Sequence, residues 1–243
     1  MAGHSKWANI KRRKAKVDAQ RGKVFTKLGR ELIVATRQGG PNPEGNLRLR
    51  LAIQRARGAN MPAEHIQRAI RKAAGEGGGD DYEDFTYEGY GPGGVAILVE
   101  GTSDNRNRTL PEVRYLFSRN GGGLGEAGCV AWLFDRKGLI VVERAAPDLD
   151  EEALMLAALE GGAEDVRDEG DSFAVLTAPA DLERVRAALA GHDLPIAHAE
   201  LTRVPRSLVE VVGEDREQVE RLIELLEDHD DVQNVYANCD LPG

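Results

Sequence analysis

Cysteine and long apolar runs are scarce in this sequence. Its 243 residues include two cysteines, Cys129 and Cys239. They lack the short paired spacing of a zinc knuckle and the number of bridges that a small secreted scaffold needs. No apolar run follows the first Met, and no stretch approaches the roughly 20 apolar residues that cross a bilayer. We therefore expect a cytoplasmic protein that is neither secreted nor inserted in a membrane.

Motifs for metal binding and catalysis are also missing. The histidines are scattered, without an HExxH motif or a cysteine at ligand spacing: His4, His65, His192, His198 and His229. The acidic residues from Glu224 to Asp231 offer oxygen ligands for a hard cation, but acidic runs at helix ends are commonly just solvated. No nucleophile, base and orienting residue can be assembled. We expect no enzyme activity, no catalytic residue, no metal site and no cofactor.

Two glycine-rich segments resemble phosphate-binding loops without meeting their requirements. Gly123-x-Gly125-x-x-Gly128 matches the dinucleotide fingerprint, but it follows a predicted helix and precedes a predicted strand, the reverse of the order that this fingerprint needs. The segment Gly89 to Gly94 lacks the Lys-Ser/Thr pair of a P-loop. Both segments are interpreted as turns.

Charge is present in abundance and is divided unevenly. The net charge is −9, yet residues 1–75 hold 18 of the 32 basic residues and only 4 of the 41 acidic ones, a net charge of +14. The rest of the chain therefore carries −23. Such a division is typical of a nucleic-acid-binding module attached to an acidic body. In the alternative interpretation, the basic face pairs with the acidic body; the concentration of the positive charge favours nucleic acid.

Apolar spacing predicts three short helices in the basic third, over about 22–38, 45–57 and from 61–62 to 74, after a basic arm over 3–20 and before an acidic linker over 76–81. Further along, strands are predicted over 85–87, 95–99 and 129–134, with a helix over 109–119. Residues 138–204 show the order βαββαβ of a ferredoxin-like domain. A last helix (215–227) and strand (232–236) have no core of their own, so we expect them to complete the middle domain.

The predicted fold is therefore an α+β multidomain protein. Residues 1–79 form the basic arm and an amino-terminal helical bundle. Residues 80–136 and 205–243 form a discontinuous α+β middle domain, into which a ferredoxin-like βαββαβ domain, residues 137–204, is inserted.

The strongest functional signal is the cationic arm, which has no acidic residue before Asp18. Cations of this kind gain affinity for any nucleic acid by releasing counterions from phosphates. Trp7 either stacks on an unpaired base or packs on the helical bundle, and the sequence leaves both open. His4 and Trp7 are candidates for base or loop contacts, and the expected phosphate contacts are Lys6, Lys11, Arg12, Arg13, Lys14, Lys16, Arg21, Lys23 and Lys27.

Long sequence words resemble the YebC/PmpR family. They begin with MAGHSKWANIKRRKAKVDAQRGKVFTKL and continue with ANMP, YEGYGPGGVAILVE, TSDNRNRT, VAWLFDRKG and LLEDHDDVQNVY, so that the resemblance spans essentially the whole chain. It implies the same three domains. Departures are modest: Gly128-Cys129 stands where small or hydroxyl residues are commoner, and Leu208 to Val212 is rich in valine.

The resemblance implies a nucleic-acid-binding regulator. Bacterial members are described as probable transcriptional regulators that bind DNA, and mitochondrial relatives as translational activators. One hypothesis is a DNA-binding transcription regulator, although no predicted helix shows the Asn, Gln and Arg array of a dedicated major-groove reader. The alternative is a translation factor whose arm binds ribosomal RNA or the ribosome. The acidic domains are expected to contact a protein partner, and no membrane partner is expected.

Overall fold

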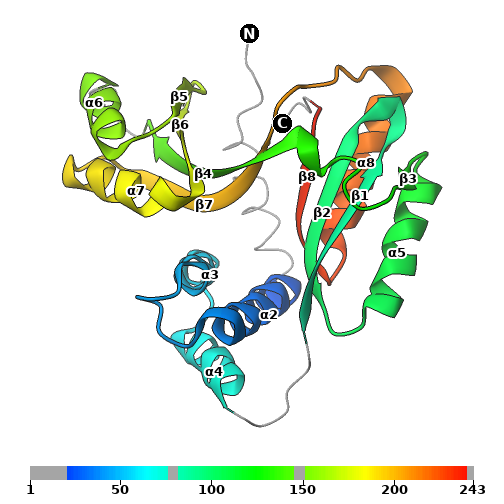
Figure 1. Cartoon of the computed structure of the whole chain (residues 1–243), viewed down its shortest axis with the longest axis horizontal. Helices are drawn as coiled ribbons and strands as arrows, with labels where there is room; N and C mark the ends of the chain where they lie inside the picture. The colour runs from blue at the N-terminus through cyan, green and yellow to red at the C-terminus, as the bar shows by residue number, and fades with distance from the viewer. Residues whose placement is uncertain (1–20, 76–81, 145–150, 240–243) are drawn as a thin grey trace. The chain divides into compact units, whose positions relative to one another are not determined.

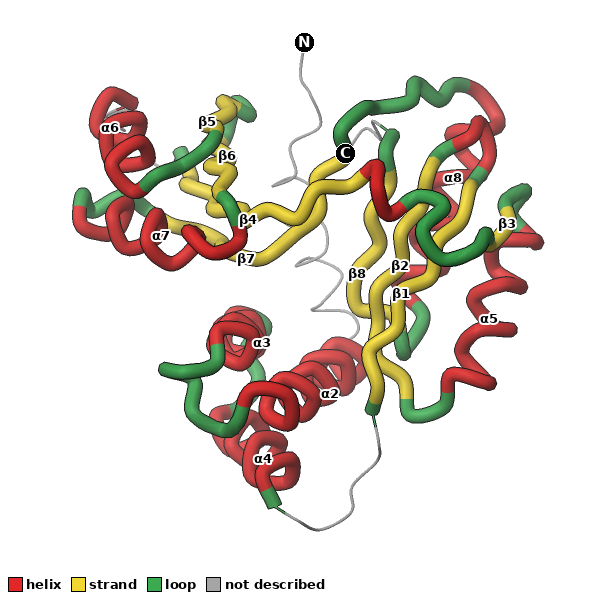
Figure 2. Tube along the Cα trace, viewed as in Figure 1, coloured by secondary structure: helices red, strands yellow, loops and turns green. Residues whose placement is uncertain are grey.

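The computed structural model describes residues 21–75, 82–144 and 151–239. It is a mixed α and β structure whose described residues form seven α-helices and two four-stranded antiparallel sheets (Figure 1, Figure 2). They divide into two compact units. One contains Phe134–Arg206, and the other contains the described residues from Arg21 to Leu133 together with Ser207–Cys239.

Three helices begin the described chain: α2 (Arg21–Gly39), α3 (Leu47–Gly58) and α4 (Ala63–Ala74). They agree with the predicted helices to within a few residues at each end. Leu32, Leu49 and Ile66 are almost fully buried in their shared core. Pro62 precedes α4, where its fixed φ suits a helix start and its missing donor costs nothing.

Asn46 joins the end of α2 to the start of α3. Its buried side chain donates from Nδ2 to the carbonyls of Ala35 (2.7 Å) and Gly40 (2.9 Å), and its Oδ1 accepts from the Leu49 N–H at 3.0 Å. One amide therefore caps the start of α3 and binds backbone carbonyls near the end of α2. Gly40 lies just past α2 with a φ of +83°, a conformation that favours glycine.

The first sheet has the strand order β3-β1-β2-β8. Its strands are β1 (Glu83–Tyr90), β2 (Ala96–Ser103), β3 (Gly123–Leu124) and β8 (Val232–Ala237). The helices α5 (Arg106–Arg119) and α8 (Gly213–Asp228) contact each other and lie against this sheet (Figure 1). Because β8 pairs with β2, the tail of the chain completes this sheet, as its lack of a core predicts.

The second sheet has the strand order β5-β6-β4-β7. Its elements follow one another as β4 (Phe134–Glu143), α6 (Glu151–Gly161), β5 (Asp165–Asp168), β6 (Ser172–Thr177), α7 (Leu182–Gly191) and β7 (Ile196–Pro205). This is the βαββαβ order that the sequence predicts. Leu139, Val141 and Leu176 lie in its core, and α6 packs on α7.

One predicted strand is wrong. Residues 129–134 were expected to be extended, but Ala131–Leu133 form the short 3-10 turn η2 and β4 starts only at Phe134. The cause is the buried Glu88 carboxylate, which accepts the N–H groups of Gly128, Val130 and Ala131 at 2.7–2.8 Å. Backbone donors that wrap around one carboxylate are not available to a neighbouring strand.

The same contacts explain the glycine-rich segment from Gly123 to Gly128. Its first two residues form β3, and the Gly125 N–H donates to the Glu88 carbonyl at 2.8 Å. The segment is a turn, as expected, and its loop N–H groups hold an acidic side chain of the chain itself. The turn predicted over Gly89 to Gly94 is also present, because β1 ends at Tyr90 and the 3-10 turn η1 (Pro92–Gly94) leads to β2.

Candidate nucleic-acid interface

Most of the predicted nucleic-acid contacts, including the two candidates for base or loop contacts, lie outside the described residues. These are His4, Lys6, Trp7, Lys11, Arg12, Arg13, Lys14 and Lys16. Arg21 is the first residue of α2. Only Lys23 and Lys27 of the predicted set have described side chains, and both belong to α2.

Lys23, Lys27 and Arg30 lie on one face of α2, at helical spacings of four and three residues. That face contacts the acidic turn between α8 and β8. Lys23 Nζ lies 2.9 Å from Asp228 Oδ2, and Lys27 Nζ donates to the Glu227 carbonyl at 2.6 Å. The basic residues of this face therefore pair with the acidic body. This was the alternative interpretation of the uneven charge.

The surroundings change the basicity of the two lysines in opposite directions. Burial lowers the pKa of Lys27 to about 8, because a charged ammonium loses hydration there and the nearby carboxylates of Asp228 and Asp230 only partly compensate. The hydrogen bond to Asp228 raises the pKa of Lys23. Lys27 therefore loses its proton more readily than Lys23 and is the weaker candidate for a permanent contact with phosphate.

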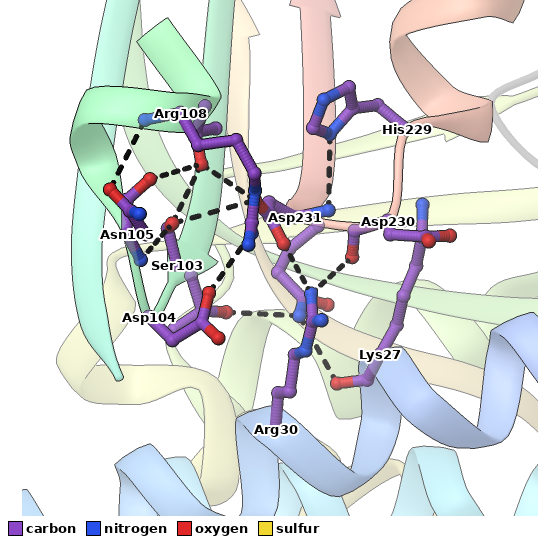
Figure 3. A network of polar contacts seen from close by, with 12 residues as sticks. Lys27, Arg30, Ser103, Asp104, Asn105, Arg108, His229, Asp230 and Asp231 are labelled. Carbon is purple, nitrogen blue, oxygen red and sulfur yellow. Dashed lines mark hydrogen bonds and ion pairs between the residues drawn. The ribbon is translucent and has the colours of Figure 1, made fainter. Parts of the chain in front are cut away.

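Asp231 is the centre of a polar network that joins α2, α5 and β8 (Figure 3). Its side chain is only 1% exposed. It accepts from Arg30 Nη1 at 2.5 Å, Arg108 Nη2 at 2.7 Å and Thr109 Oγ1 at 2.6 Å. Arg30 also donates to the Asp230 carbonyl at 2.9 Å. A buried carboxylate with three donors of this kind is paired and hydrogen-bonded, as burial of a charge requires.

The acidic run was expected to be solvated, and for Asp231 that expectation is wrong. Burial by itself would raise the pKa of Asp231, but hydrogen bonds from Thr109 and Arg108 and the charge of Arg30 outweigh it and hold the pKa below its ordinary value. Across the described ranges no group of His, Cys, Asp and Glu side chains is arranged to hold a metal ion. Within the run, Asp228 and Asp231 accept from cationic side chains of the chain itself.

Local sequence places the donors of this network. Asn105 caps α5, with its Oδ1 accepting from the Arg108 N–H, while Ser103 Oγ accepts from the Asn105 N–H at 2.9 Å. Gly101 lies at a bulge of β2, where a Cβ would stand 2.2 Å from the Asp231 carbonyl. Only glycine permits this approach, in which the Thr102 N–H donates to the Asp231 carbonyl at 2.9 Å.

A second polar contact ties the helices to the first sheet. Arg48 of α3 donates to both oxygens of Asp84 in β1, at 2.5 and 2.9 Å, and Gln38 Nε2 donates to Asp84 at 3.0 Å. Burial would raise the pKa of Asp84, but the hydrogen bonds and charge of Arg48 lower it. The bidentate geometry fixes the direction of approach as well as the charge pairing.

Three other arginines of the helices are exposed and have no such contact with the described residues. Arg57 at the end of α3 and Arg68 and Arg71 on α4 are exposed, and they form no ion pair with any residue in the described part of the chain. They were not among the predicted contacts. The signal was present in α4, where Ile66 and Ile70 are buried and Arg68 lies on the exposed side of the helix.

The comparisons with known proteins place the whole chain in one family. A model described as "TACO1/YebC protein N-terminal domain" matches residues 5–76, and one described as "TACO1/YebC second and third domain" matches residues 82–239. This chain belongs to the TACO1/YebC family. No helix among the residues that the structure describes is both long and apolar enough to span a bilayer.

Relatives named "probable transcriptional regulatory protein" are similar to it over nearly their full lengths. One from Pelotomaculum thermopropionicum is 59% identical over 241 residues, covering 99% of both chains. One from Moorella thermoacetica is 59% identical over 245 residues, covering 100% of this chain and 97% of the relative. The crystal structure of Aq1575, a conserved hypothetical protein of Aquifex aeolicus, has a TM-score of 0.84 at 49% identity and covers 100% of this chain and 96% of that one.

Sequence words that carry the TACO1/YebC resemblance meet in the Asp231 network. TSDNRNRT supplies Ser103, Arg108 and Thr109, and LLEDHDDVQNVY supplies Asp231. The end of the amino-terminal word, GKVFTKL, supplies Lys23 and Lys27. Segments far apart along the chain therefore build one polar contact, which joins the basic helices to the acidic sheet.

Proposed function

We propose that this protein is a regulator of gene expression that binds nucleic acid through its basic amino-terminal third. The observation that carries the proposal is the charge division, since residues 1–75 hold a net +14 in a chain of net −9. A concentrated positive segment attracts phosphate over several ångströms and gains affinity from counterion release. The names of the relatives, "probable transcriptional regulatory protein", support the regulatory part.

The proposed phosphate contacts are the arm residues together with the free arginines of the helices. Within α2, Lys23 already has an internal partner and Lys27 has a carbonyl acceptor. For these two, a phosphate contact requires that the nucleic acid displaces an acceptor of the chain. Arg57, Arg68 and Arg71 need no such exchange, which makes them the more favourable described contacts.

The proposed arrangement of the chain is the one that its sequence predicts: a basic arm and bundle, an α+β middle domain, and a ferredoxin-like insertion. In this proposal the acidic remainder, of net charge −23, stays away from the phosphate backbone, because like charges repel. It is then available for a protein partner. No catalytic residue is proposed, and we place the protein in the cytoplasm.

DNA is the first candidate target, in keeping with the names of the relatives. A ribosome-associated translational activator that binds RNA is the second, and one observation favours it. Tyr115 of α5 is 61% exposed beside the hollow that contains the Asp231 network. Unpaired RNA bases commonly stack on exposed aromatic side chains, whereas duplex DNA offers no free base face.

Crosslinking in cells, followed by sequencing of the attached nucleic acid, tests the proposal. A matched variant in which Lys11, Arg12, Arg13 and Lys14 are replaced by Ala should lose most of the crosslinked material. Enrichment of promoter DNA supports the transcriptional role, and enrichment of ribosomal RNA supports the translational one. Equal crosslinking of the variant and the original chain would show that the basic arm is not the contact surface.

A further inference from the structure

A solvent-filled hollow of about 540 Å³ lies between the start of α2, the outer face of α5 and the turn that precedes β8. Binding sites for small molecules and single nucleotides typically occupy about 300–1,000 Å³, so this volume is sufficient for one nucleoside. Arg108, Glu112 and Tyr115 of α5 line it, at spacings of four and three residues that put them on one helix face.

Tyr115 gives the hollow an aromatic wall. Its side chain is 61% exposed, although a large ring gains free energy by leaving water. Tyr115 has a helical neighbour, Leu116, that also lines the hollow and is half-buried. An exposed ring at the edge of a cavity provides a flat apolar surface on which a planar ligand can stack.

The charges of the hollow argue against a phosphate as the ligand. Its lining contains three cationic side chains and four carboxylates. The cations are already neutralised, since Lys23 pairs with Asp228, Arg30 with Asp231, and Arg108 with Asp104 and Asp231. A further anion would therefore meet net negative charge.

Acceptor oxygens, in contrast, remain available. The carboxylate of Asp230 is exposed and makes no hydrogen bond or ion pair with the described residues, although its backbone carbonyl accepts from Arg30 (Figure 3). Glu112 uses one oxygen on His229, at 3.0 Å. A ligand that fits this hollow is flat, carries no negative charge of its own inside it, and presents N–H donors along one edge.

We propose that the hollow binds one unpaired guanine base, stacked on Tyr115, with its N1–H and N2–H donors toward the carboxylates of Asp230 and Glu112. Guanine offers two adjacent donors to one carboxylate, whereas uracil offers a single N–H between two carbonyls that the carboxylates repel. The inference rests on the proposed nucleic-acid binding and assigns to it a base-binding site.

The position of the hollow along the chain agrees with this assignment. Lys23, one of its lining residues, lies three residues after the basic segment that ends at Gln20. In this proposal, a strand whose phosphates are bound by that segment presents one base to the hollow. Phosphate binding and base binding are then separate contributions of adjacent parts of the chain.

Fluorescence anisotropy with the full chain tests the proposal. The two probes are a 12-nucleotide oligouridine and the same oligomer with one central guanosine. We expect the guanosine probe to bind about tenfold more tightly, a gain that lies within the range for one base stacked on an aromatic side chain. The Tyr115→Ala variant should bind both probes equally, and Tyr115→Phe should retain the preference.

Three controls keep the interpretation specific. Tyr90→Ala removes another exposed tyrosine, which does not line the hollow, and should leave the preference intact. Asp230→Asn should reduce the preference for the guanosine probe several-fold, and it removes no ion pair between described residues. In the Tyr115→Trp variant, indole fluorescence should be quenched by the guanosine probe more than by oligouridine, which a purely structural role of Tyr115 would not produce.

The outcomes distinguish this inference from the function on which it rests. If both probes bind the original chain equally, or if Tyr115→Ala keeps the preference, the base site is wrong while nucleic-acid binding stands. If neither probe binds at low salt, both proposals fail. The site is supported if Tyr115→Ala abolishes the preference for the guanosine probe, Asp230→Asn reduces it, and Tyr90→Ala leaves it intact.

Discussion

Arg30 and Asp231 are 201 residues apart in the sequence, and Nη1 of the arginine lies 2.5 Å from Oδ1 of the aspartate. The arginine side chain is 15% exposed and the aspartate side chain 1% exposed. A contact so far from water is screened little by salt and depends on both partners being present. It holds α2 against the turn that leads into β8, so the basic helices and the first sheet share one buried ion pair.

Replacing Asp231 with Asn should destabilise the protein by about 2–4 kcal/mol, because Arg30 and Arg108 would lose charge-assisted hydrogen bonds at a buried site. Urea denaturation followed by circular dichroism measures the change. Asp228→Asn is the matched control. Its pair with Lys23 is about half exposed on both sides, so we expect a loss of at most about 1 kcal/mol. Equal effects of the two variants would show that burial of Asp231 contributes nothing.

Acid should destabilise the original chain more than the Asp231→Asn variant. The pKa of Asp231 in the folded protein lies below its ordinary value, because donors from Thr109, Arg108 and Arg30 outweigh the effect of burial. The stability that it contributes is therefore present above about pH 4 and is lost as the pH falls through the folded-state pKa. Between pH 6 and pH 2, the urea concentration at the unfolding midpoint should fall less steeply for Asp231→Asn than for the original chain. The same pH dependence in both proteins would contradict the lowered pKa of Asp231.

Lys27 should also make stability rise with pH, but in the alkaline range. Its pKa is lowered to about 8 in the folded protein, so between pH 8 and about 10.5 the unfolded chain binds more protons and stability from this residue rises with pH. Relative to Lys27→Met, the original chain should gain about 2 kcal/mol between pH 7 and pH 9.5. Lys23→Met is the control, since the pKa of Lys23 is raised and no such gain is expected. A constant difference between the original chain and Lys27→Met would contradict the lowered pKa.

The elements of the fold could largely be predicted from the sequence, because their causes are local. The spacing of Leu32, Ile66 and Ile70 marks buried helix faces, and Pro62 and Gly75 mark the limits of α4. The turn after Gly128 could not be predicted, since it depends on Glu88, which lies 40 residues earlier. The continuous apolar run over residues 129–134 resembles a strand until that carboxylate is considered.

The candidate site could also be predicted only in part from the sequence. The basic arm could be selected from charge alone, but the partners of α2 could not, because Asp228 and Asp231 are about 200 residues away from it. An acidic run looks solvated when its cations are unknown. Tyr115 carried no signal either, since one tyrosine in a helix becomes informative only when its exposure and its neighbours are known.

Salt dependence should report how many phosphates the arm contacts. If six to ten phosphates are bound, affinity should fall by about three to five decades between 50 and 200 mM salt. Replacing Lys11, Arg12, Arg13 and Lys14 with Ala should reduce the slope of log affinity against log salt by about three to four. Arg68→Ala combined with Arg71→Ala should reduce it by about two. Arg167→Ala, an exposed arginine of the other compact unit, should leave it unchanged.

The choice between DNA and ribosomal RNA follows from what the basic third lacks as well as from its charge. Cations are plentiful there, but a helix with the array of base-reading side chains is absent from the described residues 21–75. Such a surface matches dense, folded RNA phosphate better than one particular duplex sequence. The exposed Tyr115 supplies an aromatic face on which an unpaired RNA base can stack.

We therefore expect a substantial fraction of the protein to sediment with ribosomes at low salt. It should leave them when salt is raised, because the contacts are ionic, and when residues 1–20 are deleted, because those residues supply six of the eighteen basic residues of the basic third and only one of its acidic residues. Sucrose-gradient sedimentation of both forms gives the measurement, with an RNase-treated lysate as the control for RNA. The Arg167→Ala variant should sediment like the original chain. Absence from ribosomal fractions at low salt, together with tight footprinted binding to a defined promoter, would overturn the translational reading and favour transcriptional regulation.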